Sequence, residues 1–124
     1  MGIEVLRSNE GESVNRTGDA IFIGEVRARN LAGDSKDISA SIVQFNPGAR
    51  TKMHRHESDQ MLLVLSGIGK VGDAVGEHVI GTGDSATITA GHDHWHGAGD
   101  TGSPMSHLTI TLPGGETIVE GQPQ

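Results

Sequence analysis

The sequence contains no cysteine, which excludes disulfides, thiolate metal ligands and cysteine nucleophiles. Basic residues are few: nine Lys and Arg stand against sixteen Asp and Glu, giving a net charge of −7. Nucleic-acid binding needs clustered basic side chains that neutralise phosphates, so no nucleic-acid partner is expected. The chain also has no apolar run of transmembrane length, so no membrane partner is expected either. Residues 1–18 lack an apolar core of signal-peptide length, and we therefore expect a cytoplasmic protein.

Glycine and β-branched residues dominate what is present. Nineteen glycines punctuate short runs rich in Val, Ile and Thr, and aromatic residues are limited to one Trp and two Phe. Frequent glycine turns between short β-branched runs are typical of a sandwich or barrel. The length of 124 residues suits a single domain, residues 1–124. We place its barrel core at about residues 38–112 and further N-terminal strands in residues 1–37.

The strand pattern predicts an all-β fold without helices. Alternating or continuous apolar runs predict strands at 20–29, 38–46 and 106–112, and two short strands in 53–66 around a bend at 57–59. Residues 67–84 read as a hairpin and residues 85–99 as a strand, a turn and a second short strand. An edge strand is expected at Ile3–Leu6, and the tail offers at most one more. Nine or ten short strands favour a double-sheet jelly roll or small barrel.

Seven histidines are the most unusual feature of the sequence. Six fall in three groups: His54 and His56; His92, His94 and His96; and His107. The seventh, His78, is expected at the surface. Residues two apart in an extended strand point the same way, so His-x-His brings two imidazoles to one point.

A single His-x-His is weak evidence, because such a pair is often an ordinary pair of strand residues. Two groups of this kind, each beside glycine turns, favour a metal site. Neutral imidazole suits Mn, Fe, Zn, Ni, Co and Cu. We therefore expect one divalent metal ion per chain.

The spacing of these residues resembles the two motifs of the cupin family. Gly48, His54, His56, Gln60 and Gly67 meet every spacing of the first motif, with glutamine in place of the usual glutamate. In the second motif, Gly83, Gly91 and His94 match, while Thr89 replaces a proline and Ala98 an asparagine. The resemblance covers about residues 38–112 and implies a double-stranded β-helix, the jelly-roll barrel of cupins.

The resemblance implies His54, His56 and His94 as metal ligands and position 60 as the fourth. Two interpretations of Gln60 remain open: its amide oxygen binds the metal, or it hydrogen-bonds nearby and water completes the coordination. Glu57 is a third possibility for the missing carboxylate, although an extended backbone would point it away from His56.

Glutamine at this position changes the expected chemistry. Three imidazoles and an amide leave a divalent ion with its full +2 charge, so it binds less tightly and is a stronger Lewis acid. We therefore expect redox-quiet Lewis-acid chemistry rather than oxygen activation.

A closer resemblance is to the small bacterial cupins with hydroxynitrile lyase activity. It is carried by the runs 47–51 (PGART), 94–98 (HWHGA) and 105–108 (MSHL) together with His54, His56 and Gln60. That resemblance implies manganese held by three His and one Gln, and His107 as the acid or base that moves the cyanohydrin proton. The stretch 56–60 (HESDQ) departs from the apolar residues of that subgroup.

The remaining candidates are assigned from the rule that residues two apart in a strand share one face. His96 shares the face of His94 and is expected as a second catalytic residue or, alternatively, as a surface residue. Ser41, Val43, Thr109 and Thr111 are predicted to line the substrate pocket. His92 is expected to be exposed, and Trp95 to pack in a subunit interface or the outer core.

Three functions remain open from the sequence. The first is a metal-dependent lyase acting on a small organic molecule, the second a cupin-type dioxygenase, and the third a non-catalytic metal-binding or small-ligand-binding module. A cupin sugar epimerase would need a tyrosine acid, and the chain has no tyrosine. A free sheet edge and Trp95 near the surface favour a homodimer.

Overall fold

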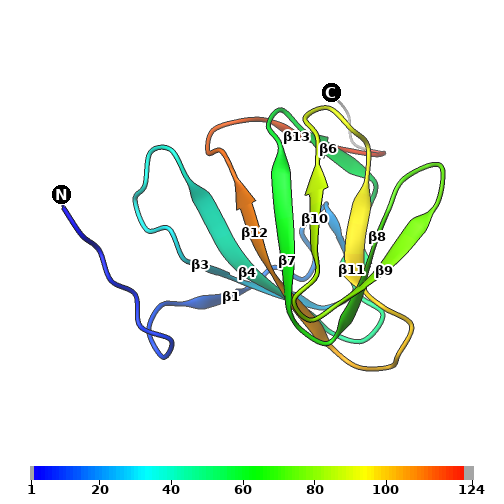
Figure 1. Cartoon of the computed structure of the whole chain (residues 1–124), viewed down its shortest axis with the longest axis horizontal. Coiled ribbons are helices and arrows are strands. Elements are labelled where there is room, and N and C mark those ends of the chain that lie inside the picture. The colour runs from blue at the N-terminus through cyan, green and yellow to red at the C-terminus, as the bar shows by residue number, and fades with distance from the viewer. Residues whose placement is uncertain (1, 122–124) are drawn as a thin grey trace.

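The computed structural model describes residues 2–121, and its regular structure is entirely β (Figure 1). Met1 and residues 122–124, which belong to the expected domain of residues 1–124, lie outside the described residues. The strands are β1 (Ser13–Asn15), β2 (Phe22–Ile23), β3 (Val26–Asn30), β4 (Ser39–Phe45), β5 (Arg50–Thr51), β6 (His54–His56), β7 (Gln60–Ser66), β8 (Ile68–Gly72), β9 (Glu77–Gly81), β10 (Ser85–Ile88), β11 (Trp95–Ala98), β12 (Met105–Thr111) and β13 (Thr117–Val119). Within residues 2–121 there is no helix that could cross a membrane.

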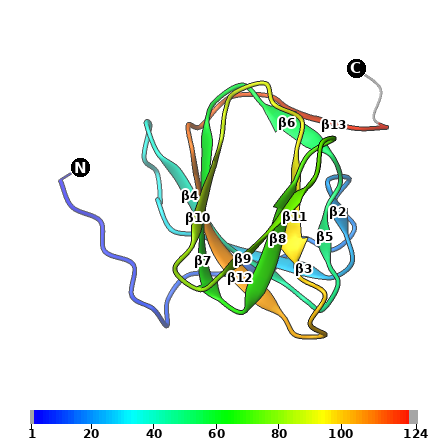
Figure 2. The ribbon, with the colours of Figure 1, turned by 45° about the vertical axis from the view of Figure 1, so that its right-hand side comes forward.

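These strands form two curved sheets that face each other, as expected for a jelly-roll barrel (Figure 2). The six-stranded sheet has the order β1-β3-β4-β12-β7-β10, and the five-stranded sheet has the order β2-β5-β11-β8-β9. A third, two-stranded sheet of β13 and β6 lies at one end of the barrel. Every pairing is antiparallel, and the alternation of burial along β4, β7 and β12 follows the pleat.

The predicted strand at 20–29 is divided in two. Gly24 lies between β2 and β3 with φ of +88°, and a Cβ there would lie 2.9 Å from the Cβ of Ala49. The chain turns at this point because glycine alone adopts the conformation freely and leaves room for Ala49. As a result β2 joins the five-stranded sheet and β3 the six-stranded one.

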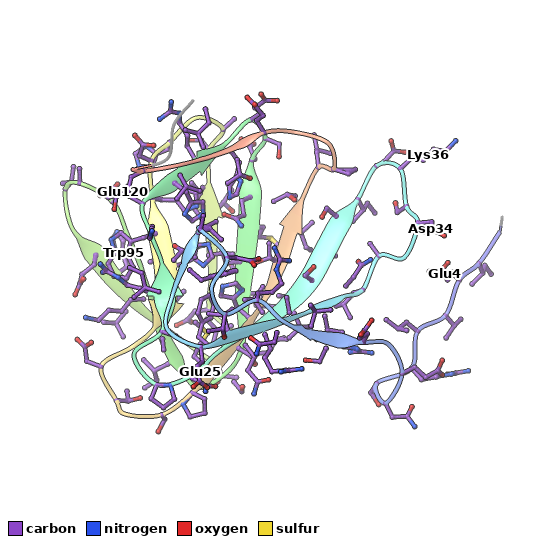
Figure 3. The ribbon with its side chains drawn as sticks, turned by 180° about the vertical axis from the view of Figure 1, so that it is seen from behind. Glu4, Glu25, Asp34, Lys36, Trp95 and Glu120 are labelled. Atoms are coloured by element: carbon purple, nitrogen blue, oxygen red, sulfur yellow. The ribbon has the colours of Figure 1, made fainter. Side chains whose placement is uncertain are left out.

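The expected edge strand at Ile3–Leu6 is wrong for the single chain. Residues 2–7 are not paired, and the first strand is β1, which pairs with β3. The N-terminal segment stands away from the barrel, and Figure 3 shows Glu4 beyond it, close to the 31–37 loop that carries Asp34 and Lys36. Local alternation of apolar residues does not make a strand by itself, because a strand also needs a partner to which it can hydrogen-bond.

The barrel interior is filled by the inward side chains of both sheets. Phe45 and Leu62 are fully buried, and Val26, Val64 and Met105 are 1% exposed. Gly97 lets β11 approach β5, since a Cβ on it would lie 2.4 Å from the Cβ of Arg50. This close approach holds His96, the residue before Gly97, inside the barrel, where it is 5% exposed.

Candidate metal centre

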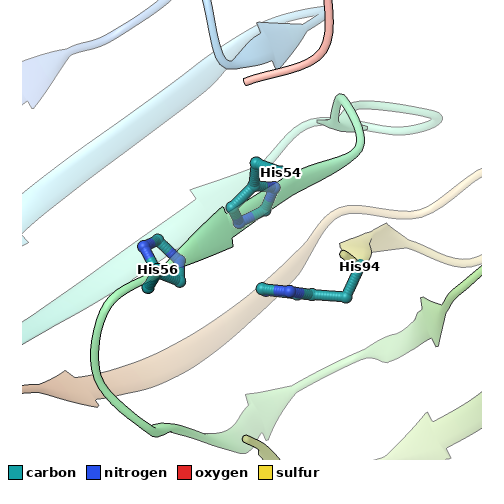
Figure 4. Close-up of side chains that lie close together, drawn as sticks. All are labelled: His54, His56 and His94. Atoms are coloured by element: carbon teal, nitrogen blue, oxygen red, sulfur yellow. The ribbon is translucent and has the colours of Figure 1, made fainter. Parts of the chain in front are cut away.

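Three histidines meet at one end of the barrel. Two of them, His54 and His56, lie on β6 and point the same way, as Figure 4 shows. His94 faces them because His54 and His94 form an antiparallel bridge, with N–O distances of 2.8 and 2.9 Å in the two directions. One ring nitrogen from each of the three lies within 4.8 Å of the others.

The other nitrogen of each ring is held by a fixed partner. The Nδ1 atoms of His54 and His94 lie 2.8 Å from the carbonyl oxygens of Lys52 and His92, respectively. A carbonyl can only accept, so each Nδ1 carries the proton and each Nε2 keeps a lone pair. The Nδ1 of His56 is 3.0 Å from Oγ1 of Thr117 on β13. This is the arrangement by which outer partners orient metal-binding histidines.

Gln60, at the start of β7, completes the group. It is 4% exposed, and its Oε1 lies 3.0 Å from Nε2 of His94. Because His94 donates from Nδ1 to a carbonyl, its Nε2 keeps a lone pair toward the Gln60 amide. Both interpretations of Gln60 fit this contact: its oxygen binds an ion together with Nε2, or its NH2 group donates to Nε2.

The donor set therefore fits a divalent metal ion. Nε2 of His54 and Nε2 of His56 are buried without any hydrogen-bond partner, which is costly unless something binds there. Burial lowers the pKa of His54 to about 3 and also lowers the pKa values of His56 and His94 below 6.5. All three are neutral near pH 7, the state in which imidazole binds metal.

A second group of polar side chains lies deeper in the barrel, beside the metal-binding group. Nε2 of His107 is 3.1 Å from Nδ1 of His96, and Nδ1 of His107 is 3.2 Å from Oγ1 of Thr109. His107 is 1% exposed, and burial lowers its pKa to about 4 and that of His96 well below 6.5. The ring centroid of His96 lies 5.3 Å from that of His54, so the hydrogen-bonded series Thr109–His107–His96 ends next to the candidate metal ligands. Its last atom, Nε2 of His96, is buried without a partner.

The predicted pocket residues lie on the inward face of the six-stranded sheet. Val43 pairs with His107, Ser41 pairs with Thr109, and Val43 is 9% exposed. Thr111 continues the same face toward the end of β12, beside Glu57 and Gln60 in an open hollow. Their position beside the histidines agrees with the predicted sharing of one strand face. Their contact with a substrate remains a prediction.

A cleft of about 590 Å³ reaches the metal-binding group between β9 and β10, the edge strands of the two main sheets. Its apolar walls include Val71, Ile80, Ala86 and Ile88, and His94 lines it. His78 is exposed, as expected, but it also lines this cleft. The cleft joins solvent to one of the candidate ligands.

The other residues named from the sequence lie apart from the metal-binding group. His92 is exposed and binds Asp73 through a 2.9 Å contact, because residues 89–93 form a turn rather than a strand. Glu57 is exposed and lies outside the three-histidine group. Trp95 is half-buried, with the Arg50 guanidinium 4.9 Å from its ring centroid.

Sequence reasoning missed the residues that orient the ligands. Thr117 lies 61 residues after His56 in the sequence, so no motif spacing relates the two residues. Two of the orienting groups are main-chain carbonyls, which no sequence pattern reveals. Thr51 was also missed as a buried residue: it is 1% exposed, and its Oγ1 accepts a hydrogen bond from the His96 amide at 3.1 Å.

Comparisons with known proteins agree with this geometry. A protein-family model described as a cupin domain matches residues 41–111. Over 94 residues the chain is 42% identical to an (R)-mandelonitrile lyase from Granulicella tundricola, covering 72% of this chain and 70% of that protein.

Solved structures show the same architecture. A cupin-like protein from Thermotoga maritima superimposes with a TM-score of 0.75 at 26% identity, over 88% of this chain and 85% of that one. The polyketide cyclase RemF from Streptomyces resistomycificus superimposes with a TM-score of 0.80 at 14% identity, over 98% and 88% of the two chains. The second likeness concerns the fold alone.

Proposed function

The chain belongs to the cupin family, and from that premise we propose that it is a metal-dependent lyase that cleaves cyanohydrins. The (R)-mandelonitrile lyase that it resembles carries this reaction in its name. We further propose one divalent ion per chain, manganese before iron, zinc, nickel, cobalt or copper, bound by His54, His56, His94 and Gln60. Bound there, the ion would act as a Lewis acid toward the substrate oxygen.

The residues of this chain supply the proton transfer. In one arrangement, His107 donates from Nδ1 to Thr109 and His96 donates from Nδ1 to His107, so Nε2 of His96 has a free lone pair. In the other, Thr109 donates to His107, His107 donates to His96, and Nε2 of His96 carries the proton. Both arrangements hold the same number of protons, so a proton taken up by Nε2 of His96 leaves one positive charge, which the hydrogen bond lets His96 and His107 share until the proton is returned.

The reaction then balances as follows. Nε2 of His96 removes the hydroxyl proton of the cyanohydrin, the bond from the carbinol carbon to the nitrile carbon breaks, and the C=O bond of the aldehyde forms. The electron pair of the broken bond leaves with cyanide, which takes the proton back and departs as hydrogen cyanide. We therefore propose His96 as the residue that moves the proton, in place of the role predicted for His107. His107 and Thr109 act as positioning residues for His96.

The observation that carries the proposal is the set of unpartnered Nε2 atoms on His54, His56 and His96. Two of them belong to the metal-binding group and one to the relay beside it. Neutral, partnerless imidazoles packed together in a barrel are destabilising unless they bind ligands. This arrangement supports a metal and a substrate held side by side.

The test is cyanide release from mandelonitrile by protein loaded with manganese. We expect release that stops when the metal is removed and returns when it is restored. The variants His96→Gln and His107→Ala should keep the metal and lose turnover by at least about 100-fold, whereas His54→Ala should lose both. Loaded protein that releases no cyanide but consumes oxygen with a catechol or diketone would make the protein a dioxygenase instead. Protein that does neither would be a binding module.

A further inference from the structure

The cleft between β9 and β10 leads to the residues proposed for the reaction. Val71, on the lining of the cleft, stands directly opposite His96 in the pairing of β8 with β11. Ile88, also on the lining, stands opposite Gln60 in the pairing of β10 with β7. Residues opposite each other in an antiparallel pair are neighbours on one face of the sheet. The inner end of the cleft therefore lies beside both the proposed proton-transfer residue and the metal-binding group.

The inner walls of the cleft are apolar. Val71, Ile80 and Ile88 are each less exposed than 10%, at 8%, 9% and 7%, and Ala86 is half-buried. The cleft volume of about 590 Å³ lies within the range of roughly 300–1,000 Å³ that is usual for small-molecule sites. Displacing water from such walls favours binding of an apolar group. The inner part of the cleft therefore suits an uncharged hydrocarbon group of the size of an aromatic ring.

The mouth of the cleft is polar. His78 on β9 continues a row across the five-stranded sheet, because Val71 stands opposite both His96 and His78. With strands about 4.8 Å apart, the main chains of His78 and His96 are about 10 Å apart along this row. Across the mouth, Nε2 of His92 lies 2.9 Å from Oδ2 of Asp73, which joins the turn before β11 to the turn after β8. The mouth is thus held in shape, and the exposed imidazole of His78 lies on its lining.

The open hollow at the end of β12 has different chemistry. Three carboxylates line it, those of Asp37, Glu57 and Asp59. Among the described residues that line the cleft, Asp73 alone carries a carboxylate, and it is paired with His92. Covering a charged group with an apolar one costs the charge its hydration, so an uncharged ring is better placed in the cleft.

We propose that this cleft binds the organic group of the substrate, and that the substrate is an aromatic cyanohydrin with a hydroxyl group on its ring. The inference rests on the proposed lyase function. The ring lies between Val71, Ile80 and Ala86, and the carbinol carbon lies at the inner end beside His96. The ring hydroxyl points along the row toward His78, whose imidazole can donate or accept a hydrogen bond. His78 is then a specificity-determining residue, and Ala86 limits the size of the group that enters.

Rates of cyanide release from three cyanohydrins test the proposal in manganese-loaded protein. They are para-hydroxymandelonitrile, mandelonitrile and lactonitrile, whose organic groups are a phenol, a phenyl ring and a methyl group. The wild-type kcat/KM should fall in that order. His78→Phe should lower kcat/KM for para-hydroxymandelonitrile about two- to tenfold more than for mandelonitrile, since one hydrogen bond is lost.

Filling the cleft tests the position of the ring. Ala86→Leu should lower kcat/KM for mandelonitrile at least about tenfold more than for lactonitrile, because only the larger group needs the space. Val75→Leu is the matched control and should leave all three ratios unchanged. Val75 is 95% exposed in the turn between β8 and β9 and does not line the cleft.

Binding of para-hydroxybenzyl alcohol separates this proposal from that of the lyase, because the alcohol has no nitrile to release. In NMR spectra of isotope-labelled wild-type protein, the alcohol should shift the amide signals of Val71, His78 and Ala86, and not that of Val75. Such binding without cyanide release would support the cleft as the site and refute the lyase. The proposal is overturned if the alcohol shifts no signals from the cleft, or if neither His78→Phe nor Ala86→Leu changes the ratios between the substrates.

Discussion

Replacing Thr117 by valine removes one hydrogen bond from outside the ring of metal ligands. Thr117 Oγ1 lies 3.0 Å from Nδ1 of His56, and valine keeps the shape of threonine without the oxygen. His54 and His94 are oriented by main-chain carbonyls, which no side-chain substitution removes. Among the described residues, the Thr117 hydroxyl is therefore the side-chain group that orients the ring of a candidate ligand histidine.

The expected effect follows from the exposure of the site. Loss of such an outer partner weakens metal binding by about 10- to 100-fold, or roughly 1.4 to 2.7 kcal/mol. His56 is half-buried, so water can replace the hydroxyl in part. We therefore expect the lower end, about tenfold weaker binding, since a water molecule costs some entropy to hold in place.

Competition with a chromogenic chelator measures the affinity of metal-free protein for Mn²⁺ and Zn²⁺. Thr117→Ser keeps the hydroxyl and should bind within about twofold of wild type. The reasoning fails if Thr117→Val binds as tightly as wild type while its thermal stability is unchanged. It also fails if serine and valine weaken binding equally, since the effect would then come from packing of β13.

Three further predictions concern acid stability, ligand charge and packing. His107 is neutral when folded, with its pKa lowered to about 4, but takes up a proton near pH 6.5 when unfolded, so it costs metal-free protein stability as pH falls from 6.5 toward 4. This loss is about 3 kcal/mol at most, and urea titrations at pH 7 and pH 5 should show a smaller difference for His107→Gln than for wild type. Gln60→Glu adds a negative ligand charge and should tighten metal binding at least about tenfold while slowing cyanide release, as chelator competition and turnover assays would show. Gly97→Ala places a Cβ 2.4 Å from the Cβ of Arg50 and should destabilise the fold by about 1–3 kcal/mol in urea, with full stability disproving the close contact.

The sequence was sufficient to predict the barrel and the three histidines that could hold a metal ion. Strand periodicity and glycine turns predicted the all-β class, the His-x-His spacing indicated a metal site, and the motif resemblance gave the three histidines that now lie within reach of one ion. These features are local, because a strand fixes the direction of residues two apart. The bridge between His54 and His94 joins residues far apart in the chain, so strand periodicity could not predict it. The motif resemblance implied only that the two side chains bind one ion.

What the sequence could not provide depends on contacts between distant segments. The exposure of His92 was predicted, but its contact with Asp73 was not, because Asp73 belongs to a distant turn. His96 lies nearer the candidate metal ligands than His107, with ring centroids 5.3 Å from His54 and 5.7 Å from His94. This order depends on how β11 and β12 pack across the barrel, which no sequence pattern gives. A lone apolar segment such as Ile3–Leu6 looks like a strand in any sequence, and only the available partners decide whether it pairs.

The bridge between His54 and His94 has a consequence for how an ion would enter this site. Two main-chain hydrogen bonds fix the separation of these residues, so the cradle has its shape before anything enters it. We therefore expect that a metal ion could be added and removed without unfolding the barrel. Imidazole and amide donors accept many divalent ions in the same geometry. Which ion the protein would carry in a cell would therefore depend on the metal available when the finished protein meets it, as well as on the ligands.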